Sequence, residues 1–177
     1  MIRVALIGPE CTSKSTLAEE LADYYQTKWV KEYAREFLDK NGSDYTLKDV
    51  LEIAKGQTAR ELEMRNEANR FLFSDTELII TKVWCEDVFK ECPEWIENNI
   101  SVQKFDLYLL TFPDIPWIED PLRENPHRRE FLFNWYEKEL QMIHANYKII
   151  KGLGKDRLNN AVSAVEEFLK ENSASIK

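Results

Sequence analysis

The sequence has 177 residues, with 24 Lys and Arg against 32 Asp and Glu, which gives a formal net charge of −8. The length suits a single α/β domain spanning residues 1–177, and an apolar content of 44% lies outside the range of disordered chains. The acidic balance disfavours bulk binding to nucleic acid or to an anionic membrane. Any bound phosphate must therefore be held by a local set of donors.

Signals for membrane insertion, export and zinc binding are weak. The longest uninterrupted apolar run has four residues, whereas a membrane span needs roughly 20. The cysteines and histidines lack the spacing of a zinc site, and reduced thiols fit the cytoplasm. We therefore expect a cytoplasmic protein that starts at Met1 and does not cross a membrane.

Short apolar runs alternate with segments of helical periodicity along the chain. The apolar runs predict strands at 4–7, 29–30 with its flanks, 71–73, 107–112 and 147–150. Apolar spacings of three and four predict helices that include residues 17–25, 47–54, 80–88, 132–143 and 158–169. Thr46 and Asp49 form a capping box for the second helix, and residues 172–177 are expected to fray. The order predicts a five-stranded parallel sheet with right-handed crossovers.

A phosphate-binding motif follows the first predicted strand and opens the first helix. Its sequence, Gly8-Pro-Glu-Cys-Thr-Ser-Lys-Ser15, fits GxxxxGK[ST] except at Ser13. In such loops backbone N–H groups surround nucleotide phosphates, the lysine reaches the β and γ oxygens, and a hydroxyl binds Mg²⁺. The motif predicts a site for ATP and Mg²⁺ that includes Gly8, Ser13, Lys14, Ser15 and Thr16. The alternative is a solvated turn.

Ser13 occupies the position at which the motif has glycine. Glycine lets the backbone approach the phosphates and adopt a torsion that is costly for other residues. We expect serine to strain this loop.

Several further stretches resemble the ribosylnicotinamide kinase domain of bacterial NAD-biosynthesis proteins. Besides the phosphate loop, they are Glu32-Tyr-Ala-Arg-Glu36, Phe73-Ser-Asp-Thr76 and Asp114-Ile-Pro-Trp117. The similarity runs in order from Val4 to about Arg157. It implies a three-layer P-loop fold similar to nucleoside monophosphate kinases, with a lid. It also implies transfer of the ATP γ-phosphoryl group to the 5′-hydroxyl of nicotinamide riboside.

The family often carries this domain behind an adenylyltransferase and sometimes a DNA-binding module. Because the chain begins at the first strand of the kinase, we expect neither of these here.

Two carboxylates end predicted strands at the sheet edge where ligands of open α/β folds bind. Asp75 is a candidate for holding Mg²⁺ or accepting the substrate proton, and a helix N-cap is its alternative. Glu32 is a candidate for binding ribose hydroxyls or for taking the 5′-hydroxyl proton. Arg35 is placed to pair with Glu32 or to contact substrate phosphate, and a plain surface ion pair is the alternative. The spacing does not decide which carboxylate is the base.

Residues 113–129 are predicted to form a stiff lid. The stretch 112–129 holds four prolines and no glycine, so it continues neither a strand nor a helix through its centre. Arg123 is expected to bring positive charge to the transferring phosphoryl group, with Arg128 and Arg129 as further candidates against simple solvation. Asp114 and Trp117 are candidates for contacting a pyridinium ring, against a tryptophan packed beneath the lid.

The turn at Gly152 and Gly154 precedes the last predicted helix. In the resembling kinases the corresponding turn borders the adenine, so Gly152 and Arg157 are candidates for framing that base. A simple strand-to-helix turn is the alternative. Trp84, Trp95 and Trp135 are assigned to the core.

These patterns predict an ATP-dependent, Mg²⁺-requiring kinase with nicotinamide riboside as the preferred small-molecule acceptor. Two alternatives stay open. One is a kinase of another nucleoside or small alcohol, and the other is a P-loop domain that binds nucleotide as a regulatory module without catalysis.

Overall fold

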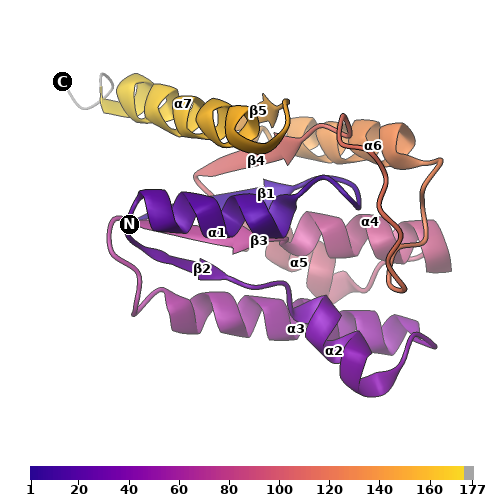
Figure 1. Ribbon diagram of the computed structural model, residues 1–177. Coiled ribbons are helices and arrows are strands. Elements are labelled where there is room, and N and C mark those ends of the chain that lie inside the picture. Colours follow the sequence, from indigo (N-terminus) through magenta and orange to yellow (C-terminus); the bar gives the residue numbers. More distant parts are fainter. Residues whose placement is uncertain (174–177) are drawn as a thin grey trace.

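The computed structural model describes residues 1–173. Its five strands form one parallel sheet in the order β2-β3-β1-β4-β5 (Figure 1). The strands are β1 Ile2–Ile7, β2 Lys28–Val30, β3 Phe71–Asp75, β4 Leu107–Thr111 and β5 Tyr147–Ile150. The predicted five-stranded parallel sheet is therefore confirmed.

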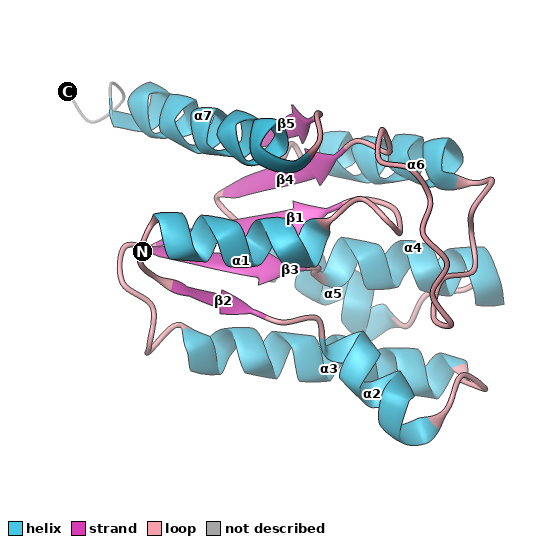
Figure 2. Cartoon of the chain, viewed as in Figure 1, coloured by secondary structure: helices cyan, strands magenta, loops and turns pink. Residues whose placement is uncertain are grey.

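Helices cover both faces of the sheet and give the molecule three layers (Figure 2). Helices α1 and α7 pack on one face, and α3, α4, α5 and α6 contribute to the core on the other. The bounds are α1 Lys14–Tyr24, α2 Tyr33–Asn41, α3 Leu47–Met64, α4 Leu78–Phe89, α5 Glu94–Val102, α6 Arg129–Met142 and α7 Gly154–Ser173.

The central strand β1 shows why the sequence has a continuous apolar run here. Val4 and Leu6 face the core beneath α1 and α7, whereas Ala5 and Ile7 face the opposite core. All four side chains are fully buried. A strand covered on both faces has no polar side, so its sequence does not alternate between polar and apolar residues.

The structure corrects two sequence expectations. Helices α2 and α5 were not predicted, because α2 has a single buried residue, Leu38, and α5 has only Ile96 and Ile100. The last helix also runs through Ser173, and the side chain of Asn172 donates a hydrogen bond to the carbonyl of Phe168. The rest of the tail expected to fray lies outside the described residues.

Helix α3 begins with the predicted capping box at Thr46 and Asp49. The capping box is confirmed, since each side chain accepts a hydrogen bond from the other residue's backbone N–H. Within residues 1–173 no helix is long and apolar enough to span a membrane.

Candidate active site

A cavity of about 520 Å³ lies beside the carboxyl ends of the central strands. In Figure 1 the arrowheads of these strands point towards the side where residues 113–129, the lid segment, cross the molecule. The cavity brings together many of the residues predicted from sequence: Gly8, Ser13, Lys14, Ser15, Thr16, Glu32, Arg35 and Arg123.

Gly8 allows the phosphate loop, residues 8–15, to pass close to β4. Its φ is +148°, and a Cβ atom there would lie 2.4 Å from Oγ1 and 2.8 Å from the carbonyl oxygen of Thr111. Thr12 then secures the loop, because its buried hydroxyl donates to the Pro9 carbonyl at 2.8 Å and lies 2.7 Å from Thr111 Oγ1. This close approach excludes a side chain at position 8.

The phosphate loop presents free backbone donors to the cavity. Cys11 and Ser13 have φ values of 53° and 58°, in the left-handed region. Among the described residues, no acceptor takes the backbone N–H groups of residues 11–13. Successive N–H groups in such turns form anion-binding concavities. Lys14 adds a charge, and its ammonium lies over the loop and donates to the Pro9 carbonyl at 2.9 Å.

Replacing Ser13 by glycine is expected to relieve the strain in the phosphate loop. A left-handed conformation costs a residue with a Cβ about 1 to 2 kcal/mol, so Ser13→Gly should raise kcat/KM for ATP several-fold. Steady-state kinetics of both chains at varied ATP measures this. A lower kcat/KM in the variant would instead indicate that the serine hydroxyl binds a phosphate oxygen.

Asp75, at the end of β3, is fully buried, and neither of its carboxyl oxygens has a hydrogen-bond partner within residues 1–173. Burial raises the pKa of this carboxyl, while the nearby Lys14, Ser15 and Arg35 act in the opposite direction. Buried polar groups are normally satisfied, so an orphaned carboxylate points to a ligand. A hydrated divalent cation, which prefers oxygen ligands, fits the pair formed by Asp75 and the Ser15 hydroxyl.

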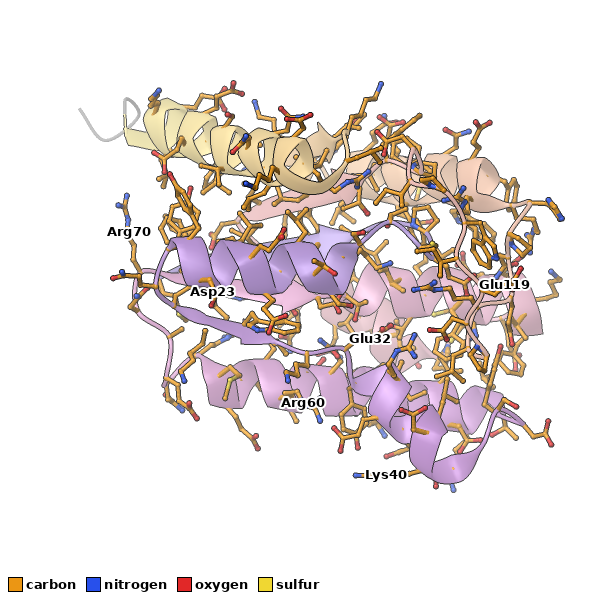
Figure 3. All side chains as sticks on the ribbon, viewed as in Figure 1. Asp23, Glu32, Lys40, Arg60, Arg70 and Glu119 are labelled. Atoms are coloured by element: carbon orange, nitrogen blue, oxygen red, sulfur yellow. The ribbon has the colours of Figure 1, made fainter. Side chains whose placement is uncertain are left out.

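Glu32 lies between the end of β2 and the start of α2 (Figure 3). Its pKa is also raised, first by burial and then by the charge of Asp75, while Lys14, Arg35 and Arg123 lower it. Unlike Asp75, Glu32 lines the cavity. Two carboxylates and one lysine thus converge beside the phosphate loop.

Gln57 of α3, a residue for which the sequence indicated no role, connects the backbones that carry these two carboxylates. Its buried side chain accepts a hydrogen bond from the Tyr33 N–H at 2.7 Å and donates one to the Asp75 carbonyl at 3.1 Å. At the neighbouring Gly56, a Cβ would lie 2.4 Å from the Tyr33 ring. The sequence feature that could have indicated a role for Gln57 is an amide side chain on the apolar face of a predicted helix.

The cavity also has an aromatic wall, formed by Tyr45, Trp84 and Tyr136. Trp84 Nε1 donates to the Tyr45 hydroxyl at 3.0 Å, and their rings meet edge to face at 4.8 Å. The Tyr45 hydroxyl in turn donates to Glu124 of the lid segment at 3.2 Å. Trp84 packs against the core as expected, but it also lines the cavity, which the sequence did not indicate.

Contacts to the phosphate loop and to α2 hold the lid segment in place. Glu10 accepts hydrogen bonds from the N–H groups of Glu124 at 3.1 Å and Asn125 at 2.9 Å. Arg35 pairs with Asp120 at 3.1 Å, so its predicted pairing with Glu32 is not formed. Arg123 lines the cavity and donates to the Ile118 carbonyl at 2.6 Å.

The remaining predicted residues lie outside the cavity lining. Arg128 forms an ion pair with Asp87 at 2.7 Å, and the guanidinium of Arg129 lies 5.8 Å over the Trp117 ring. Substrate contacts for these residues stay predictions.

Asp114 accepts hydrogen bonds from the Gly152 N–H at 2.7 Å and from the buried Arg157. This contact ties the start of the lid segment to the turn before α7. A substrate contact for Asp114 and an adenine contact for Gly152 and Arg157 stay predictions.

Comparison with known proteins decides the family. Residues 3–157 match the family described as AAA domain. The chain belongs to this family. It is also 30% identical over 135 residues to the trifunctional NAD biosynthesis/regulator protein NadR of Escherichia coli K12, covering 72% of this chain and 33% of NadR. The NadR protein of Salmonella typhimurium is 30% identical over 124 residues, or 30% of its length. The chain thus spans about a third of these curated relatives.

Solved structures share the fold of this AAA-domain chain. A crystal structure of NadR protein in complex with NR has a TM-score of 0.78 and 21% identity, over 94% of this chain and 50% of that one. A thymidylate kinase from Ehrlichia chaffeensis has a TM-score of 0.62 and 9% identity, over 93% and 97% of the two chains. The predicted resemblance and the three-layer P-loop fold of nucleoside and nucleotide kinases are confirmed.

Proposed function

We propose that this protein transfers the γ-phosphoryl group of ATP to the 5′-hydroxyl of nicotinamide riboside, which yields nicotinamide mononucleotide. The observation that carries the proposal is one cavity lined by Glu32, Lys14 and a loop whose N–H groups at residues 11–13 have no acceptor among the described residues, with the buried Asp75 at the end of β3. Phosphoryl transfer needs positioned reactants and charge stabilisation rather than covalent chemistry from the protein, and these groups supply both.

Exposure separates the roles of the two carboxylates. Asp75 is fully buried next to Ser15, so we assign these two residues to holding Mg²⁺, which when bound neutralises charge on the β and γ phosphates. Glu32 lines the cavity, so we assign it to orienting the acceptor and taking the 5′-hydroxyl proton. Lys14 and the N–H groups of the phosphate loop hold the phosphates.

The chemistry of the cavity wall supports a cationic aromatic acceptor. Tyr45, Trp84 and Tyr136 offer ring faces and edges, and the carboxylate of Glu124 lies against Tyr45. A pyridinium ring carries a positive charge that is attracted both to aromatic faces and to carboxylates. A NadR structure with a similar fold was solved in complex with NR, which supports this choice of acceptor.

An ADP-release assay with a panel of acceptors tests the proposal. We expect turnover with nicotinamide riboside and Mg²⁺, and far less with purine nucleosides, pyrimidine nucleosides or small alcohols. Preferred turnover of another acceptor would favour a different nucleoside kinase. ATP binding by calorimetry without turnover on any acceptor would indicate a regulatory nucleotide-binding module.

Arg123→Ala is expected to lower kcat at least about tenfold with little change in the KM for ATP, because a guanidinium that meets the phosphoryl group on lid closure acts on the transition state. The Arg123 guanidinium donates hydrogen bonds to the Ile118 carbonyl in the lid segment and to the Cys11 sulfur, so it lies close to the phosphate loop. Steady-state kinetics separates the two parameters. A raised KM for ATP at unchanged kcat would make Arg123 a ground-state binding residue.

A further inference from the structure

The structure assigns Arg129 and Arg157 to positioning the phosphate loop. In this role they fix the peptide groups of the loop. A glycine at position 13 would let these groups adopt the same orientation without such support. The inference rests on the proposed function only in that the loop binds nucleotide phosphates.

Arg157 reaches the phosphate loop from the first turn of α7. Its guanidinium is almost fully buried, and its Nη1 donates to the Thr12 carbonyl at 3.1 Å. The same side chain donates to the carbonyls of Gly152 at 2.8 Å and Phe112 at 3.0 Å, and pairs with Asp114. The fixed fork of an arginine thus joins the phosphate loop to the ends of β4 and β5.

Arg129 makes the equivalent contact one residue earlier in the loop. It is the first residue of α6, and its Nη1 donates to the Cys11 carbonyl at 3.3 Å and to the Ile115 carbonyl at 2.7 Å. Two successive carbonyls of the loop are therefore held by arginines from two different helices.

The direction of these carbonyls determines where the N–H groups of the loop point. A trans peptide group is planar, with its C=O and N–H on opposite sides. Residues 1–173 contain no cis peptide bond. With the Cys11 and Thr12 carbonyls turned to the arginines, the N–H groups of Thr12 and Ser13 point away from them. These N–H groups have no acceptor within the described residues, and both residues line the cavity.

Ser13 explains why the loop needs such support. Its left-handed φ of 58° is unfavourable for a residue with a Cβ, so an unsupported loop would relax towards torsions that turn the N–H groups aside. A glycine at position 13 has no such preference. The inference therefore predicts an energetic coupling between each arginine and position 13.

A double-mutant cycle tests this coupling. Arg157→Gln and Arg129→Gln are each made in the natural chain and in the Ser13→Gly background, and binding of ADP with Mg²⁺ is measured by calorimetry. In the natural chain we expect each arginine variant to weaken binding at least about tenfold, as for the loss of a charged hydrogen bond. In the Ser13→Gly background the loss should be less than about threefold. The KM for ATP should rise accordingly, while the KM for the acceptor stays unchanged.

Arg65→Gln is the matched control, since Arg65, the residue after α3, hydrogen-bonds Glu61 of that helix and lies outside the cavity lining. It should lower the melting temperature without changing nucleotide affinity. If Arg157→Gln does not fold, the more exposed Arg129→Gln carries the test.

Unchanged nucleotide affinity in arginine variants that melt at lower temperature would overturn the inference, as would equal losses of affinity in both backgrounds. If the variants show the expected coupling but the natural chain transfers no phosphoryl group, the positioning role is supported and the proposed function is contradicted.

Discussion

Lys14→Ala is expected to lower kcat by about a hundredfold to a thousandfold or more, the usual cost of losing a group that stabilises transition-state charge. Lys14 is the first residue of α1, and its ammonium lies over the loop in which the N–H groups of residues 11–13 have no acceptor among the described residues. Its hydrogen bond to the Pro9 carbonyl is a minor contact for the fold, so the melting temperature should change little. Initial rates at saturating ATP and acceptor measure the effect.

Lys55→Ala is the matched control for this prediction. Lys55 is a partly exposed lysine of α3 whose ion pair is with Glu52 on the same helix. We expect it to keep full activity. Unchanged turnover in Lys14→Ala, with a normal circular dichroism spectrum, would contradict the assignment of the phosphate loop.

Asp75→Asn is expected to reduce kcat at least about a hundredfold, because an amide does not balance the charge of a metal ion. At the same time the variant should be more stable than the natural chain at neutral pH. The natural carboxyl is buried without a hydrogen-bond partner among the described residues, and ionising it there is unfavourable. Activity lost with stability gained marks a functional residue rather than a structural one.

The pH dependence of stability follows from the raised pKa of Asp75. In the unfolded chain this carboxyl titrates near its usual pKa of about 3.9, whereas in the folded protein burial raises the pKa. Between these two pKa values the folded state holds more protons, so the free energy of unfolding falls as the pH rises. Urea unfolding at a series of pH values should show a smaller fall for Asp75→Asn. An identical pH dependence in both chains would contradict this account.

The sequence predicts the strands well because their signal is local. A strand such as β1, buried on both faces, requires a continuous apolar run, and the residue after each strand falls at the same edge of a parallel sheet. That rule alone predicts that Glu32 and Asp75 lie at one edge of the sheet, where the phosphate loop follows β1. The strain expected at Ser13 appears in the structure as its left-handed φ.

The contacts that tune the site were not predictable in the same way, because they join distant positions through irregular backbone. Arg129 and Arg157 bond loop carbonyls that lie 118 and 145 positions earlier in the sequence. The sequence predicted contacts of both residues with substrate or nucleotide, and those contacts stay predictions. Glu10 holds the lid segment from 115 positions away, and Gln57 joins the start of α2 to the end of β3. No local periodicity encodes such pairings.

Product identification tests the central claim most directly. The protein is incubated with nicotinamide riboside, ATP and Mg²⁺, and the products are followed by phosphorus NMR and mass spectrometry, with 5′-deoxy nicotinamide riboside as the blocked acceptor. We predict one nicotinamide mononucleotide, phosphorylated at the 5′ oxygen, for each ADP formed, and no phosphorylated product from the blocked acceptor. ADP formed without phosphorylated nucleoside, or phosphorylation at another hydroxyl, would contradict the account.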